Sequence, residues 1–122
     1  MYIYSNPNPC KTLVGDCVVR ALSLVENDTW ESVYGELCEL GYYMCDMPSS
    51  NEVWGEYLDI KGYNRYSIPN PFTTVHDFCR QHRKGTYVLG TGSHVVAVID
   101  GNHYDTWDSK DETPVYYWQK EK

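Results

Sequence analysis

The segment Ser93–Trp107, with the sequence SHVVAVIDGNHYDTW, carries the strongest fold signal in this chain of 122 residues. Its first half is a run of β-branched and small apolar residues, which is typical of a buried strand. Asp100–Gly101 follows, a dipeptide that favours the tight turn of a β-hairpin. Asn102–Trp107 has the composition of the returning strand. The segment therefore predicts two antiparallel strands.

The residues before this hairpin are spaced as in helices. In the segment from Cys17 to about Glu26, the apolar residues recur on one helical face. Further helices are expected from a capping signal at Asp28 to a stop at Gly41, and from a capping signal at Ser49 to a stop at Gly62. The remaining expectations are a short helix opened by Thr74, strands over Tyr63–Ile68, Thr86–Leu89 and Pro114–Gln119, and an irregular lead-in over Met1–Asp16.

Because the helical segments come first and most strands come later, the order favours an α+β domain over an alternating α/β fold. The chain shows no internal repeat, low-complexity segment or linker. We therefore expect one domain over residues 1–122.

The composition makes two classes of partner improbable. There are 10 Lys and Arg residues against 17 Asp and Glu residues, which gives a formal net charge of -7. Nucleic-acid binders carry a basic face, and anionic membranes attract basic segments. No long apolar run is present, and Met1–Pro7 lacks the pattern of a secretion signal. We expect no nucleic-acid or membrane partner, and a cytoplasmic location.

The cysteines argue against a disulfide framework and against a structural zinc site. Their number is odd and their spacing is wide, and no Cys-x-x-Cys pair occurs. The acidic loop after the hairpin lacks the spacing of a calcium-binding EF-hand. We expect free thiols, no metal and no cofactor. The five cysteines are Cys10, Cys17, Cys38, Cys45 and Cys79.

Cys17 differs from the other cysteines in its position at the start of a predicted helix, directly after Gly15–Asp16. The free N–H groups and partial positive charge of a helix N-terminus stabilise a thiolate and lower the pKa of the thiol. The same N–H groups can bind the oxyanion formed during acyl transfer. The position alone is also consistent with a small core residue that has no catalytic role.

His94 and Asp105 supply the partners that a thiol nucleophile needs. They lie at the open end of the predicted hairpin, one on each strand, so the two side chains are expected to meet. Asp105 would then orient His94, and His94 would exchange a proton with Cys17. The alternative for Asp105 is a charged residue of a solvated turn. His103 alternates with Tyr104 and is expected to face solvent.

This order of residues resembles the papain-like cysteine peptidase superfamily. The matching segments are Gly15–Cys17, His94–Val98 and Asp105–Trp107. The resemblance implies a fold in which N-terminal helices, with the nucleophile at a helix N-terminus, pack on a C-terminal antiparallel β-sheet. It also implies a catalytic triad of Cys17, His94 and Asp105 that acts on peptide or protein substrates without a cofactor.

The oxyanion donor of that superfamily is not matched. The family places a Gln a few residues before the Cys, whereas no Gln precedes Cys17 here. Lys11 and Asn8 are the candidate oxyanion donors. The carboxylate of Asp16 would oppose a thiolate at Cys17 unless it faces away or pairs with a cation such as Arg20.

Two further resemblances bear on the setting. The order Cys, His, Asp is similar to that of bacterial cell-wall endopeptidases with an Asp-Cys-Ser-Gly motif, where this chain has Asp16–Val19. Val14–Ala21, Trp54–Leu58 and His94–Ser109 resemble small proteins of phages and prophages of Gram-positive bacteria. Cell-wall cleavage would require export, or release at lysis.

We therefore predict a thiol hydrolase that cleaves an amide, peptide or isopeptide bond in the cytoplasm of a bacterial host. The alternative is a catalytically weak or inactive protein on the same fold, which binds and inhibits a host or defence protein. These two readings differ in one property. A pure binding protein gives no reason for Cys17 to react faster than the other four thiols.

Overall fold

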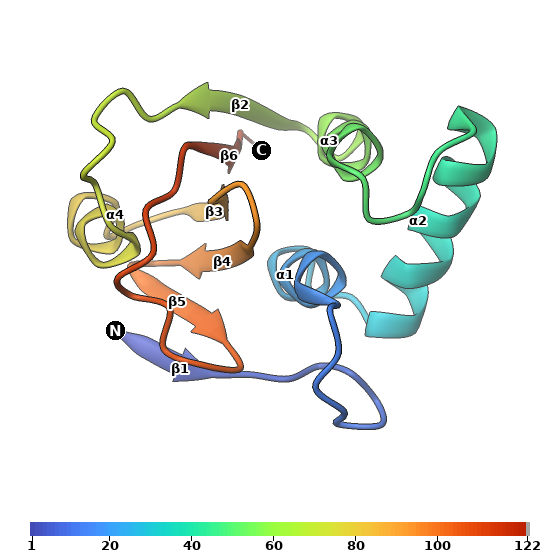
Figure 1. The fold of residues 1–122 in the computed structure, drawn as a ribbon, viewed down its shortest axis with the longest axis horizontal. Helices are drawn as coiled ribbons and strands as arrows, with labels where there is room; N and C mark the ends of the chain where they lie inside the picture. Colours follow the sequence, from blue (N-terminus) through green and yellow to red (C-terminus); the bar gives the residue numbers. More distant parts are fainter. Residues whose placement is uncertain (122) are drawn as a thin grey trace.

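The computed structural model describes residues 1–121, which form four helices and six strands (Figure 1). This content confirms the expected α+β class. The helices are α1 (Cys17–Val25), α2 (Trp30–Met44), α3 (Asn51–Ile60) and α4 (Val75–Gln81). The strands are β1 (Tyr2–Tyr4), β2 (Tyr63–Ser67), β3 (Thr86–Gly90), β4 (Val95–Ile99), β5 (Asn102–Asp105) and β6 (Tyr116–Lys120).

All six strands belong to one sheet with the order β1-β5-β4-β3-β6-β2. The sheet is mixed, because β1 pairs with β5 in parallel while the other neighbours are antiparallel. The C-terminal strands β3 to β6 pair antiparallel, as expected. The parallel strand β1 was not expected, and it corrects the prediction of an irregular lead-in for Tyr2–Tyr4. The three residues of β1 gain their backbone partners from a strand about a hundred residues later, and local sequence patterns do not show such pairing.

The predicted hairpin is confirmed. Asp100 and Gly101 both have positive φ, 51° and 81°, as the tight turn between twisted antiparallel strands requires. The ladder pairs Ile99 with Asn102 and Ala97 with Tyr104. This register places the start of β4 beside the end of β5, where the two candidate catalytic side chains lie.

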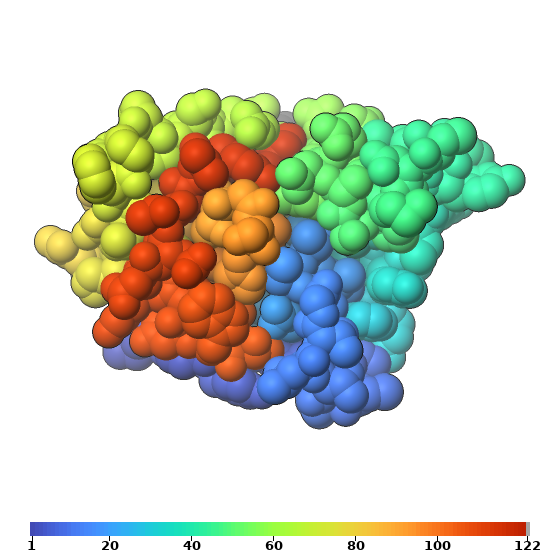
Figure 2. All heavy atoms as spheres, in the orientation of Figure 1, coloured from blue at the N-terminus to red at the C-terminus, as the bar shows by residue number. Residues whose placement is uncertain are grey.

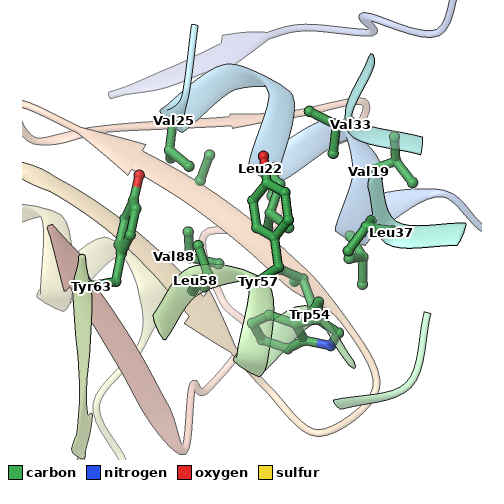
Figure 3. Close-up of a cluster of buried hydrophobic side chains, with 14 of the residues drawn as sticks. Val19, Leu22, Val25, Val33, Leu37, Trp54, Tyr57, Leu58, Tyr63 and Val88 are labelled. Atoms are coloured by element: carbon green, nitrogen blue, oxygen red, sulfur yellow. The ribbon is translucent and has the colours of Figure 1, made fainter. Parts of the chain in front are cut away.

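Helices cover both faces of the sheet (Figure 1). Val95 and Ala97 of β4 pack in the cluster formed with α1, α2 and α3. Val96 and Val98 pack in the cluster formed with α4. Burial on both faces explains why the sequence of β4 is apolar at every position instead of alternating. Figure 3 shows Leu22 of α1 and Leu58 of α3 in the larger cluster.

The helix ends differ from the sequence expectations at α2. Gly41 does not end this helix, which continues to Met44 and is followed by Cys45 with φ 57°. A Cβ atom at position 41 would lie 2.8 Å from the carbonyl oxygen of Asp46. Gly41 therefore permits the chain after the helix to fold back against it.

The helix caps are shifted by one residue at two helices. The side chains of Thr29 and Ser50, rather than those of Asp28 and Ser49, accept hydrogen bonds from the backbone of α2 and α3. Thr74 forms the expected capping box with Asp77. None of the four helices described is long and apolar enough to cross a bilayer.

The packing of α1 predicts how much its central residue contributes to stability. Leu22 is fully buried in the larger cluster. We expect Leu22→Ala to lower the free energy of unfolding by about 2–5 kcal/mol, because it removes buried apolar contacts and leaves a cavity. Urea unfolding followed by tryptophan fluorescence measures this loss.

Leu13→Ala is the matched control, because the side chain of Leu13 is 75% exposed. This exposed substitution should change the free energy of unfolding by less than about 0.5 kcal/mol. Equal urea midpoints for the two variants would contradict the packing of α1 described here.

Candidate active site

Cys17 is the first residue of α1, and the N-terminus of this helix has no side-chain cap. The residue in the capping position, Asp16, makes no hydrogen bond to the helix backbone. By contrast, the other three described helices are each capped by a Ser or Thr side chain. The first N–H groups of α1 therefore have no intrahelical carbonyl and no side-chain cap as partner.

Cys17 lines a cavity of about 200 Å³ to which four parts of the chain contribute, one of them β6 with Tyr116. The other three parts are Gly15 and Cys17 at the start of α1, Asn51 at the start of α3, and His94 in the loop before β4. In Figure 2 these parts, coloured blue, green and orange, meet on one face of the molecule. The fold thus brings residues more than 75 positions apart around one thiol.

His94 is fixed by the carboxylate of Asp105. Its Nε2 lies 2.6 Å from Asp105 Oδ2, which leaves Nδ1 as the ring nitrogen available to the thiol. Asp105 is 4% exposed and also accepts hydrogen bonds from Ser109 Oγ at 2.8 Å and from the backbone N–H of Thr106 at 2.8 Å. The structure therefore brings these two predicted residues together in an oriented pair.

The electrostatics of the site favour a charged thiolate and imidazole. Burial alone would raise the pKa of the Cys17 thiol, but hydrogen bonds from His94 and the backbone N–H of Val95, with the charges of His94 and Arg20, lower it overall. Burial alone would lower the pKa of His94, but Asp105 and Cys17 raise it to about 9. Both shifts favour the thiolate–imidazolium form of the pair over the neutral form.

Arg20 neutralises the carboxylate next to the nucleophile, as the sequence suggested. Its Nε lies 3.1 Å from Asp16 Oδ1 and its Nη1 lies 3.7 Å from Asp105 Oδ1. The same Nη1 donates to Thr106 Oγ1 at 3.0 Å. Trp30 Nε1 donates to the other oxygen of Asp16 at 2.9 Å. The buried guanidinium of Arg20 thus lies within ion-pair distance of both carboxylates of the site, those of Asp16 and Asp105.

The two candidate oxyanion donors lie elsewhere. Asn8 Nδ2 donates to Asp16 Oδ2 at 3.2 Å, and Lys11 Nζ donates to the carbonyl oxygen of Asn6 at 2.8 Å. Neither residue lines the cavity around Cys17. Both groups hold the segment before α1 in place, so the structure does not bring them to the nucleophile.

His103 is not solvent-facing, contrary to the sequence expectation. It is 2% exposed, and its Nε2 lies 3.0 Å from Asp108 Oδ1. The ring of Tyr2, which belongs to β1, lies 5.4 Å from the His103 ring. The expectation failed because it treated the segment that covers His103 as an irregular lead-in.

Sequence reasoning missed two further residues of the site, Ser109 and Asn51. Ser109 is fully buried and binds Asp105, and its position four residues after Asp105 in a tight loop was the available signal. Asn51 had no such signal, because it reaches the cavity only through the packing of α3. Among residues 1–121, no group of three or more His, Cys, Asp or Glu side chains could hold a metal ion.

Together these residues place a thiol of lowered pKa, an imidazole oriented by a carboxylate and free backbone N–H groups around one cavity, an arrangement of the kind that acyl transfer uses. No protein-family model, curated protein or solved structure matches this chain. The function proposed below therefore rests on the residues around Cys17.

Proposed function

We propose that this protein is a thiol hydrolase that cleaves an amide, peptide or isopeptide bond through Cys17, His94 and Asp105. The observation that supports this most directly is the placement of Cys17. It lies at an uncapped helix N-terminus and lines one cavity with a histidine that a buried carboxylate orients. Cys79 shows the contrast within this chain: it packs in the smaller apolar cluster, and burial raises the pKa of its thiol.

In the first half of the reaction, the Cys17 thiolate attacks the carbonyl carbon of the substrate. A C–S bond forms, and the π electrons of the carbonyl move to its oxygen. The free N–H of Cys17 donates to this oxyanion. His94 then gives its proton to the leaving nitrogen, the C–N bond breaks, and an acyl thioester remains on Cys17.

In the second half, His94 accepts a proton from water while the water oxygen attacks the thioester carbon. The C–S bond breaks, the acid leaves, and the Cys17–His94 ion pair is restored. Asp105 keeps its negative charge throughout and holds the imidazole in one orientation. An amine in place of water would give acyl transfer by the same steps.

A second cavity adjoins the first, because Asn51 and Tyr116 line both. Glu52, Glu56 and Arg65 bring charged groups to this second cavity. A substrate that extends from Cys17 along α3 would therefore meet polar and charged side chains. This continuity favours a peptide or protein substrate over a small ester.

A specific surface feature favours the second candidate function, protein binding. Tyr42 and Tyr43 at the end of α2 are 80% and 74% exposed, Met47 is 68% exposed, and Ile60 of α3 is 64% exposed. Tyr43 and Ile60 line one surface hollow, and the ring of Tyr42 lies against that of Tyr43. Exposed apolar side chains that gather in this way are typical of interaction sites. A binding role alone leaves the arrangement around Cys17 without a purpose, so we rank it second.

The proposal predicts selective alkylation of Cys17 by iodoacetamide at pH 7. An ordinary thiol is only a few per cent ionised at that pH, whereas the lowered pKa of Cys17 should make it react about tenfold faster or more. Mass spectrometry of the five cysteine peptides over a pH series resolves each rate. His94→Ala should abolish the advantage, because it removes the imidazolium that stabilises the thiolate.

Exposed Cys10 and Cys45 are the internal controls. If Cys17 reacts no faster than these two thiols, or is indifferent to His94→Ala, the proposed hydrolase is wrong and binding becomes the better hypothesis. Cys17→Ala provides the blank in any subsequent screen of peptide, isopeptide and thioester substrates.

The paired carboxylate predicts the titration of His94. Asp105→Asn removes the anion that raises the pKa of His94 and leaves the burial that lowers it. The pKa should therefore fall from about 9 by about one to three pH units, which NMR titration of the imidazole measures. The imidazolium of the variant then loses its proton at a lower pH. The highest pH at which the Cys17 thiolate–His94 imidazolium pair persists therefore also falls.

Asp108→Asn is the matched control, because Asp108 pairs with His103 on the same hairpin. This substitution should leave the titration of His94 unchanged. A His94 pKa that does not respond to Asp105→Asn, or that responds equally to Asp108→Asn, would show that Asp105 does not hold the imidazolium.

A further inference from the structure

The reaction proposed above needs a second donor to the oxyanion, beyond the N–H of Cys17. Hydrolases of this type stabilise the tetrahedral intermediate with two or more N–H groups, and one missing donor costs about a hundred- to a thousandfold in turnover. Lys11 and Asn8 are bound to Asn6 and Asp16, away from the cavity. A second donor can come from another free N–H group of α1, such as that of Val18, or from another residue that lines the cavity.

Asn51 is the amide side chain that lines the cavity with Cys17. It is the first residue of α3, and the capping residue Ser50 fixes the start of that helix by accepting a hydrogen bond from the backbone N–H of Val53. The position of Asn51 relative to Cys17 thus depends on the packing of α3 in the larger cluster, in which Trp54 and Leu58 are buried.

A hydrogen bond fixes the orientation of the Asn51 amide. Trp54 Nε1 lies 3.0 Å from Asn51 Oδ1, and the side chain of Trp54 is almost fully buried. An indole N–H can only donate, so the oxygen of the amide must face Trp54. Nδ2 is then the end of the amide that does not face Trp54, and Asn51 is an exposed residue, so this N–H group is available to a bound substrate.

We propose that Asn51 is a catalytic residue that donates Nδ2–H to the oxyanion formed at Cys17, with Trp54 as its positioning residue. This inference rests on the proposed hydrolase and adds the missing donor to it. The oxyanion site then consists of one backbone N–H from α1 and one side-chain amide from α3. The competing explanation is structural, with Asn51 present only to accept the hydrogen bond from Trp54.

Two reagents separate oxyanion stabilisation from thiolate reactivity. With 4-nitrophenyl acetate, the Cys17 sulfur attacks a carbonyl carbon, an oxyanion forms, and collapse expels 4-nitrophenolate to leave an acetyl thioester. With iodoacetamide, the sulfur displaces iodide from a saturated carbon, and no oxyanion forms. Both reactions use the same thiolate. The ratio of the acetylation rate to the alkylation rate therefore does not depend on how much of Cys17 is ionised.

We expect Asn51→Ala and Asn51→Asp each to lower this ratio by about tenfold or more. The Asp variant is nearly isosteric and keeps an oxygen that accepts from Trp54, so a purely structural role would survive in it. As a donor to the oxyanion it fails, because an ionised carboxylate only accepts hydrogen bonds. The release of 4-nitrophenolate, corrected for the release by Cys17→Ala, measures acetylation even where water removes the acetyl group. Mass spectrometry of the peptide that contains Cys17 measures alkylation.

Asn64→Ala, on the exposed edge strand β2, is the control for an Asn substitution remote from the cavity and should leave the ratio unchanged. An unchanged ratio in both Asn51 variants would overturn the role of Asn51 while leaving the hydrolase intact. Slow alkylation of Cys17 in the unsubstituted protein would instead refute the hydrolase itself. Normal alkylation in the Asn51 variants also shows that they are folded around Cys17.

Discussion

The arrangement around Cys17 depends on one buried anion, the carboxylate of Asp105 at the end of β5. Burial alone would raise its pKa, but its hydrogen bonds with His94 and Ser109, the charge of His94 and the N–H of Thr106 lower it overall. A buried carboxylate is tolerated only where such partners repay its loss of hydration. Those partners come from the start of β4 and from the loop after β5, and Arg20 of α1 adds a cation at 3.7 Å. The carboxylate therefore joins the helix that carries the nucleophile to the hairpin that carries the imidazole.

Arg20 extends this constraint to the start of α1. The residue at the capping position, Asp16, is engaged by Arg20 and Trp30 instead of by the helix backbone. If Asp16 capped the helix, its carboxylate would occupy the first N–H groups of α1 and would place a negative charge beside the thiol. The ion pair thus has two effects at once, because it neutralises Asp16 and leaves the N-terminus of α1 without a side-chain cap.

The features that could be predicted from the sequence are those fixed by local interactions. The Asp100–Gly101 turn, the helix that begins at Cys17 and the capping box at Thr74 each follow from residues a few positions apart. The pairing of His94 with Asp105 was also accessible, because the hairpin sets the register between them. By contrast, β1 and the approach of Asn51 to Cys17 depend on packing between distant segments. Local patterns contain no information on such contacts, so the donor was sought in Lys11 and Asn8, which precede Cys17 in the chain.

The same hairpin carries a second His–Asp pair, and comparing the two shows why spacing alone does not define a site. His103 lies 3.0 Å from Asp108, much as His94 lies 2.6 Å from Asp105. Burial nevertheless dominates at His103 and lowers its pKa, whereas the pKa of His94 is raised to about 9. The side chain of Asp108 is 42% exposed and that of Asp105 is 2% exposed, so water weakens the first interaction and not the second. His94 also faces an acidic thiol, a partner that His103 lacks among the residues described. The buried carboxylate on one side of the ring and the Cys17 thiol on the other, rather than the His–Asp contact itself, are what distinguish His94 from His103, and the proposed proton transfer depends on both.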